Sequence, residues 1–435
     1  MLPALLVAGA LLLPRALRGD GSIEAGYSLA VRYTLGLAAF ALAIAGAAAG
    51  AASMAADRRS GALSLTLVKP PRPATLFAGK WLGVSAYCAL LLALCHALVL
   101  LPLRFGKTEN NEPYASRMVS RGIVGATLTP SRVVARQTLE QWKREERLPR
   151  IIEQWKHEGR LPKDATERDV LKELARQAEQ GYDAANNGES ITWFFHFPRA
   201  LKSGAELGLR LTFDQQWGML GAAKGVVAMR PLNAKEWACE MEIEGSVLQE
   251  VEVPFSNFDP AGYAAFEVRF TNTGGDNAES VLIHPGRGVA LLVHGQNFWA
   301  NAVRAYALQL ALIAAFAALG VMLGAAFSMP VAAFAATVLY VLSMIAPALA
   351  EEIYPADEDE KKGFMMRAGE AVTLAMQKSF EPLLSPEPLT KLTRGEKIPT
   401  PTLTRALTLG ALCFPGLAML AFWAILGLRR SQEDG

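Results

Sequence analysis

Residues 57–83 read DRRSGALSLTLVKPPRPATLFAGKWLG and separate two long apolar segments of the chain. Lys and Arg residues next to a membrane span resist translocation and therefore collect on the cytoplasmic side. The stretch contains five such cations: Arg58, Arg59, Lys69, Arg72 and Lys80. The sequence thus predicts two membrane-spanning helices joined by a cytoplasmic loop, residues 57–80.

The first part of this loop is predicted to form a short helix. Ser60 can cap its start, and Leu63 and Leu67 then lie one turn apart on one face. Pro70 and the two prolines that follow it end the helix, because proline lacks an amide donor and restricts its neighbour. We expect this helix to lie at the membrane surface.

The second part of the loop leads into the next span. A helix is expected to begin near Thr75 and to continue through Gly79 and Lys80. A surface helix joined to a transmembrane helix by a proline elbow is suited to pass on a push from a soluble partner.

Of the 435 residues of the chain, 51% are hydrophobic, and uncharged segments recur outside the loop. A helical span needs about 20 apolar residues. The predicted spans are a short first span at Met1–Pro14 and the segments 33–56, 81–103, 305–327, 330–350 and 406–428. Small-residue steps at Gly46/Gly50 and Gly320/Gly324 are expected to let helices approach closely.

We therefore predict a polytopic α-helical membrane protein with about six transmembrane helices and an extracytoplasmic α+β insert. The insert combines a helical arm with an antiparallel β-sandwich. Its arm contains a short duplication, Glu140–Pro149 against Glu153–Pro162, and its second half alternates apolar and polar residues, as at Leu207, Leu209, Leu211 and Phe213. The predicted domains are 1–103, 104–190 (arm), 191–301 (sandwich), 302–350, 351–404 (extracytoplasmic helices and loop) and 405–435.

Motifs for chemistry are absent from the sequence. No GxxxxGK[ST], HExxH or GxSxG stretch occurs, and the four cysteines form no CxxC pair. His96 lies alone in an apolar segment, where a packed, hydrogen-bonded role is favoured over a proton relay. We expect no metal, no cofactor and no catalytic activity in this chain, and the net charge of +2 gives no indication of nucleic-acid binding.

The loop resembles that of the type 2 export permeases of ABC transporters. The matching residues are Asp57, Ser60, Gly61, Leu63, Leu67, Lys69, Pro70, Arg72, Gly79, Lys80, Leu82 and Gly83. Asp57 stands where many members have Glu. The resemblance covers the membrane portion, and the insert at 104–301 departs from the plain family pattern.

The resemblance implies a permease subunit in a bacterial inner membrane, whose partners are separate ATPase subunits, a second permease subunit and the lipid bilayer. Ser60, Leu63 and Leu67 would then seat in a groove of the ATPase, and Lys69 and Arg72 would bind its acidic rim or lipid phosphates. An alternative is a membrane-anchored extracytoplasmic ligand-binding or sensor protein without transport activity. In that case the loop only orients the protein.

Overall fold

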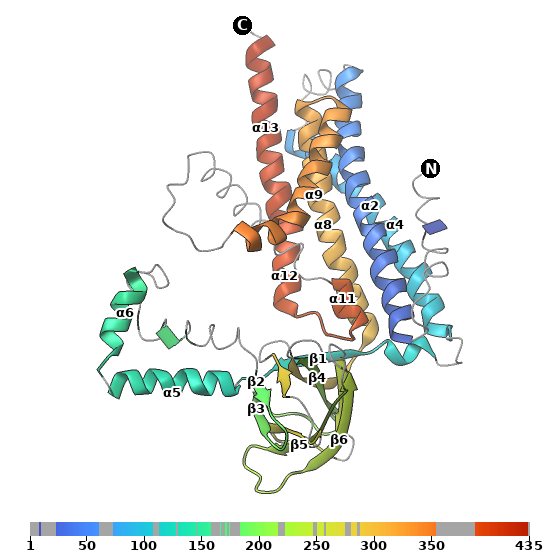
Figure 1. The fold of residues 1–435 in the computed structure, drawn as a ribbon. Coiled ribbons are helices and arrows are strands. Elements are labelled where there is room, and N and C mark those ends of the chain that lie inside the picture. Colours follow the sequence, from blue (N-terminus) through green and yellow to red (C-terminus); the bar gives the residue numbers. More distant parts are fainter. Residues whose placement is uncertain are drawn as a thin grey trace. The chain divides into compact units, whose positions relative to one another are not determined.

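A computed structural model provides the fold. It describes residues 8–9, 23–60, 73–107, 113–127, 129–144, 146–157, 166, 170–171, 174, 183–215, 222–246, 250–255, 258–274, 280–284, 288–353 and 388–433. The chain divides into two compact units, one of Met1–Ser120 with Asn297–Gly435 and one of Arg121–Gln296. The first unit is helical and the second contains the β-sheets (Figure 1).

The helical unit is a bundle of long apolar helices. Its elements are α2 (Ile23–Arg59), α4 (Pro73–Phe105), α8 (Phe298–Ala326), α9 (Met329–Ile353), α11 (Pro388–Thr393), α12 (Thr400–Thr408), the π-helical turn η2 (Leu409–Cys413) and α13 (Phe414–Glu433). Among the described residues, four stretches are long and apolar enough to cross a membrane: Gly26–Arg59, Ala74–Phe105, Phe298–Ala326 and Thr400–Leu426. Helical structure is confirmed at 33–56, 81–103, 305–326, 330–350 and 406–428.

The helix bounds differ from the predicted ones at several places. α2 begins at Ile23, ahead of the predicted start at 33, because Arg32 is exposed and tolerated in a helix. α4 begins at Pro73, two residues before the start predicted near Thr75, since proline is compatible with a first helical turn. α9 is apolar over Met329–Ser343, and the predicted turn at Ser328 is present. Most of Met1–Pro14 and residues 354–387 of the predicted extracytoplasmic region lie outside the described residues.

Glycines bring α2 and α8 into close contact. A Cβ atom placed on Gly320 would lie 2.0 Å from the carbonyl oxygen of Ala47, and one on Gly324 would lie 2.6 Å from that of Ala51. A Cβ on Gly50 would lie 2.8 Å from the carbonyl oxygen of Ala317. Gly46 is less crowded, with the Cys88 sulfur 3.4 Å away. Backbone contact of this kind is how small residues stabilise helix pairs in membranes.

The segment that precedes α12 is more buried than predicted. Leu389, Leu392 and Ile398 belong to the apolar core of the helical unit, although they lie in the predicted extracytoplasmic region 351–404 and residues 391–399 are mostly polar. Asn301 on α8 explains this, because its side chain is fully buried, donates to the Glu396 carbonyl (2.8 Å) and accepts from the Ile398 amide (2.9 Å). The buried amide thus fixes the chain where a solvated loop is expected.

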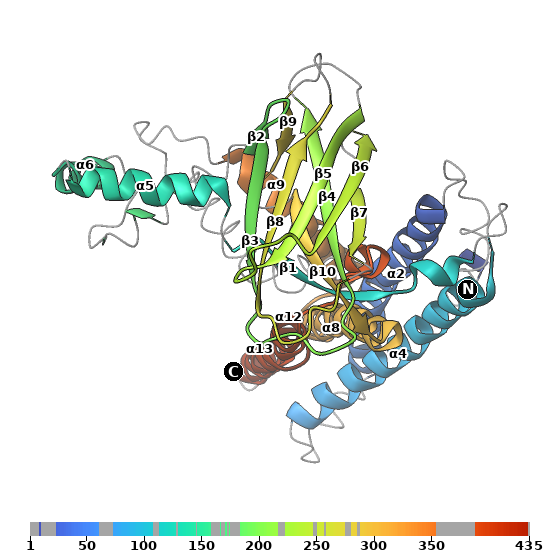
Figure 2. The same ribbon diagram turned by 90° about the horizontal axis from the view of Figure 1, so that it is seen from below.

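The second unit contains two antiparallel sheets (Figure 2). The six-stranded sheet has the order β1-β10-β4-β9-β2, with β7 also paired to β4, and the four-stranded sheet has the order β3-β8-β5-β6. The strands are β1 (Ser120–Gly125), β2 (Asp183–Ala185), β3 (Ser190–His196), β4 (Leu207–Gln215), β5 (Ala222–Pro231), β6 (Cys239–Ser246), β7 (Glu250–Phe255), β8 (Ala265–Asn272), β9 (Val281–Ile283) and β10 (Val289–Gln296).

One apolar core joins the two sheets. Trp193, Phe195 and Phe270 come from the four-stranded sheet, and Leu209 and Phe213 from the six-stranded one, all with no exposed surface. The antiparallel β-structure predicted from alternation is confirmed. The predicted boundary between 190 and 191 does not match the sandwich, because β1 and β2 come from upstream of it.

The helical arm consists of α5 (Pro130–Arg144) and α6 (Leu148–His157). The duplicated tryptophans, Trp142 and Trp155, meet edge to face with ring centroids 5.8 Å apart. Leu139 and Leu148 are buried in the same small cluster. The repeated motif therefore supplies both halves of one helix–helix contact.

Candidate functional site at the base of the 57–80 loop

The structure describes the two ends of the predicted coupling loop. Asp57 and Ser60 lie at the end of α2, and Gly79 and Lys80 lie in the first turns of α4. The remaining predicted site residues lie outside the described residues: Gly61, Leu63, Leu67, Lys69, Pro70 and Arg72. The site is therefore built from the loop's base.

An ion pair closes this base. Lys80 Nζ lies 2.6 Å from Asp57 Oδ2 and donates a second hydrogen bond to the Ser53 carbonyl (2.9 Å). The side chains of Lys80 and Asp57 are 18% and 34% exposed, so the pair contributes about 0–1 kcal/mol to stability. The main consequence of the ion pair is geometric, because it joins the last turn of α2 to the first turns of α4.

Arg58 joins the same site to a third helix. Its guanidinium donates to the Phe327 carbonyl (2.9 Å) and approaches that of Ala326 (3.5 Å). These are terminal carbonyls of α8, where a cation is favoured by the helix dipole. The start of the loop is thus tied to the turn between α8 and α9.

Ser60 differs in part from its predicted role. Its hydroxyl donates to the Ala56 carbonyl (3.0 Å) and contacts that of Asp57 (3.3 Å), so it terminates α2. Any helix that it would cap begins outside the described residues. Gly79 is exposed, and no described atom beyond its neighbours lies within 4 Å of a Cβ placed on it. Packing within the described part of the chain does not explain this glycine.

Below the ion pair, a compact apolar cluster joins four helices. Phe77 on α4 and Phe422 on α13 have ring centroids 5.5 Å apart, and both are buried. Met54 on α2 and Val321 on α8 complete the cluster. The Trp81 indole donates to the Ala314 carbonyl on α8 (2.9 Å). A displacement of the loop base would therefore move α2, α4, α8 and α13 together.

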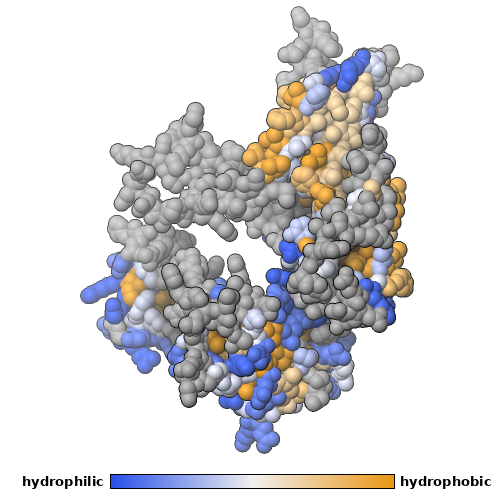
Figure 3. Space-filling model, turned by 45° about the vertical axis from the view of Figure 1, so that its right-hand side comes forward, coloured by the Kyte–Doolittle hydropathy of each residue, from blue (hydrophilic) through white to orange (hydrophobic). Residues whose placement is uncertain are grey.

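The surface around this end matches a membrane boundary. Figure 3 shows hydrophobic residues over the helices and hydrophilic residues at the end of the bundle where α2 terminates. Large apolar side chains are exposed along the length of α4, including Leu90 (72%) midway and Phe105 (82%) at the end far from the loop. Such exposure is typical of a surface that faces lipid or another protein.

His96 has a structural environment. It is buried, its Nδ1 lies 3.0 Å from the Leu92 carbonyl, and its ring meets Tyr306 edge to face at 5.5 Å. Among the described residues, no group of three or more His, Cys, Asp or Glu side chains is arranged to hold a metal ion.

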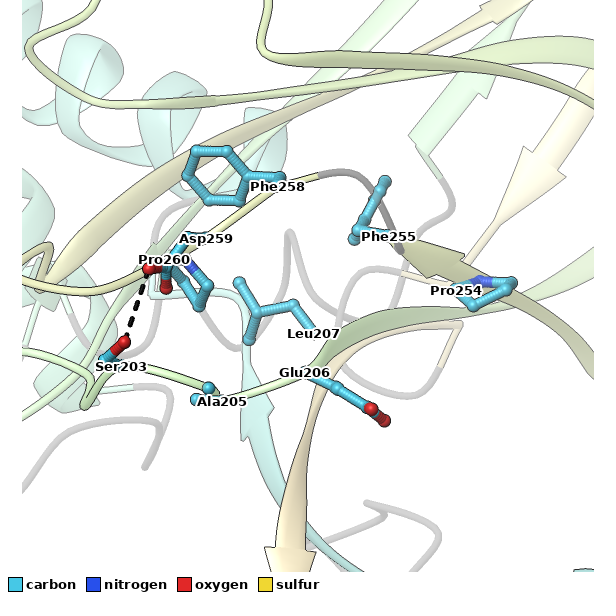
Figure 4. A pocket seen from close by; sticks show the side chains of 10 residues that line it. Ser203, Ala205, Glu206, Leu207, Pro254, Phe255, Phe258, Asp259 and Pro260 are labelled. Atoms are coloured by element: carbon cyan, nitrogen blue, oxygen red, sulfur yellow. Dashed lines mark hydrogen bonds between the residues drawn. The ribbon is translucent and has the colours of Figure 1, made fainter.

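The sandwich carries a separate pocket of about 650 Å³ (Figure 4). Leu207 and Phe255 form buried parts of its wall, and Phe258 adds an aromatic ring. Two carboxylates, those of Glu206 and Asp259, also line it. The sequence gives no signal for this pocket, because its residues come from two segments that are distant along the chain, 203–207 and 254–260.

A second feature of the sandwich that sequence patterns do not reveal is a carboxylate between two arginines. Glu252 forms ion pairs with Arg121 and with Arg210, whose Nη2 lies 3.2 Å from Oε1. Burial opposes ionisation of Glu252. The hydrogen bonds and charges of Arg121 and Arg210 outweigh that effect and hold the pKa of its carboxyl below the ordinary value.

Comparisons with known proteins assign no family. No protein family model matches the sequence, and no curated protein matches it. One solved structure, that of TmCBM61 in complex with β-1,4-galactotriose, is similar over 26% of this chain and 66% of its own length, just under two thirds. The identity is 11% and the TM-score is 0.12, too low for any conclusion about the fold or activity.

Proposed function

We propose that the chain is the permease subunit of an ATP-driven ABC exporter, and that separate ATPase subunits push on its 57–80 loop. The observation that carries the proposal is the Asp57–Lys80 ion pair at the base of that loop. Two residues of the family-like motif, 23 positions apart, meet and join α2 to α4. The resemblance of the loop sequence is the basis for proposing this family. The Asp57–Lys80 contact is the basis for proposing that force on the loop reaches both helices.

In this proposal the force that the ATPase subunits exert is transmitted through the contacts at the base of the 57–80 loop. A push on the loop displaces the joined ends of α2 and α4. The Arg58 contact carries the motion to the α8–α9 turn, and the apolar cluster carries it to α13. Two permease subunits, identical or different, would face each other in a bacterial inner membrane, each with about six spans and the insert outside.

The test is recovery of the partner. The full chain, tagged and expressed in its native host, is purified in detergent, and co-purified chains containing GxxxxGK[ST] are identified by mass spectrometry. We expect ATPase subunits with the wild type and strongly reduced recovery with Leu63→Asp or Leu67→Asp. Glu240→Gln, an exposed position on β6, is the matched control. Recovery unchanged by both loop variants would refute the proposal.

A second candidate function is supported by the sandwich pocket. A membrane-anchored ligand-binding or sensor protein would use the pocket at Leu207 and Phe258, and it would not need an ATPase. In that case no ATPase co-purifies with the wild-type chain under any condition.

A further inference from the structure

The sandwich pocket has an apolar base. Leu207, at the start of β4, and Phe255, at the end of β7, are each only 2% exposed and present side chains to it. The two are direct cross-strand partners in the β4–β7 pair, so the base belongs to the rigid sheet. Pro254 and Pro260 add apolar surface at the sides. A ligand part that lies here must be apolar to replace the water that it displaces.

The charged side chains that line the pocket are all acidic among the described residues. Glu206 and Asp259 are exposed carboxylates, and no Lys, Arg or His is among the described residues that line the pocket. Figure 4 shows the two acidic residues on different sides of Leu207. Asp259 is held in place, because its Oδ1 accepts from the Ala261 amide (3.1 Å) and its Oδ2 approaches Ser203 Oγ (3.5 Å).

An aromatic ring lies beside Asp259 (Figure 4). Phe258 is half-buried, stacks on Tyr263 with centroids 6.2 Å apart, and meets Phe266 edge to face at 6.1 Å. Its orientation is therefore fixed before any ligand binds. A ring face next to carboxylates attracts an ammonium or guanidinium group through both the ring quadrupole and the net charge.

We propose that this pocket binds a basic, apolar peptide segment, with a Lys or Arg side chain beside Asp259 and Phe258, an apolar side chain against the apolar surface of the pocket, and Glu206 adding negative charge on the other side of Leu207. The volume of about 650 Å³ lies in the range of small-ligand sites and suits two or three side chains. This ligand class goes beyond the permease assignment and does not depend on it.

The test is calorimetric titration of the full chain in nonionic detergent with two matched probes, acetyl-Phe-Lys amide and acetyl-Phe-Glu amide. We expect the Lys probe to bind and the Glu probe not to bind. Glu206→Gln and Asp259→Asn each remove one charge, and each is expected to weaken binding roughly two- to fivefold, and together roughly tenfold. Binding should also weaken as salt rises.

The variants are chosen to leave the fold intact. Asp259→Asn retains an oxygen that accepts from the Ala261 amide. Glu240→Gln, which removes an exposed charge on the four-stranded sheet, is the control. Equal affinity for both probes, an unaffected double variant, or no binding of the Lys probe at millimolar concentration would each overturn the proposal. None of these outcomes bears on ATPase recovery, so failure here is distinguishable from failure of the permease proposal.

Discussion

Glu252 illustrates how one residue couples the sandwich to pH. Its carboxyl accepts hydrogen bonds from Arg121 and Arg210, which are 9% and 7% exposed, and Glu250 lies 3.6 Å from Arg210 Nε. Because the two guanidinium groups are largely out of water, they depend on these carboxylates for neutralisation.

The pKa of Glu252 is lower in the folded state than in the unfolded state, so the stability it contributes is present above about pH 4.5 and is lost as pH falls through the folded-state pKa. We expect Glu252→Gln to lower the free energy of unfolding at pH 7 by about 1–3 kcal/mol. The variant should also show a weaker loss of stability on acidification. Hydrogen exchange of β4 and β7 peptides, corrected for intrinsic rates at each pH, measures both effects. Parallel pH curves for the wild type and the variant would contradict the linkage.

The loop base shows what residue patterns can and cannot predict. Asp57 and Lys80 are both selected by their motif, but as contacts for a partner, and their mutual ion pair follows only once α2 and α4 are known to be antiparallel neighbours. Arg58 is read from sequence as one of several basic residues. Its partner carbonyls at Ala326 and Phe327 lie 268 and 269 positions away, so no local spacing identifies them.

At the scale of helices, the contact between α2 and α8 depends on glycines, which have no side chain to separate the two backbones. The Gly320 site leaves a Cβ 2.0 Å from a backbone oxygen of α2, and backbone atoms cannot yield as a flexible side chain can. Any substitution there must separate the helices or bend one of them.

Gly320→Ala is therefore expected to lower the free energy of unfolding by about 1–3 kcal/mol or more. Gly83→Ala on α4 is the matched control, because no described atom beyond its neighbours lies within 4 Å of the added methyl group. There the substitution should be neutral or stabilise the helix by up to about 1 kcal/mol. Thermal unfolding of both variants in the same nonionic detergent provides the comparison. Equal effects at the two positions would show that α2 and α8 are not in backbone contact.

The strands show where periodicity fails. Alternation identifies β4, β6 and β8, in which apolar residues alternate with polar or small ones. Alternation does not identify β3, because Trp193, Phe194 and Phe195 are consecutive. It does not identify β5, because Val226 to Met229 form an uninterrupted apolar run. Phe194 in β3 and Val226 and Ala228 in β5 are apolar although they alternate with the core-facing residues, so the period of two is interrupted in the sequence while the sheet remains.

At the scale of the molecule, composition predicts the division into a helical unit and a β-rich unit, but not the residues at which the boundary lies. Long uncharged segments locate the membrane-length helices, because each must bury or expose apolar surface over its whole length. The position of the second unit's boundary, at Arg121 and Gln296, depends on strand pairing between distant segments. Pairing of that kind leaves no signal in a single sequence.

The orientation of the two units across the membrane is the remaining prediction. Among the described residues, α4 is the one membrane-length helix between Ser60, at the loop, and Glu240, on the sandwich. If α4 crosses the bilayer, those two positions lie on opposite sides, and the basic loop places Ser60 in the cytoplasm. We test this with Ser60→Cys and Glu240→Cys, both at exposed positions, in a background where the four native cysteines are replaced by Ala.

An impermeant maleimide should label Glu240→Cys in intact spheroplasts and Ser60→Cys only after permeabilisation. Labelling of both positions from one side would show that α4 does not span the membrane. Labelling of Ser60→Cys alone from outside would place the basic loop in the wrong compartment, where no ATPase could reach it. The permease proposal would then fail, whereas the peptide pocket of the sandwich would stand or fall on its own titration.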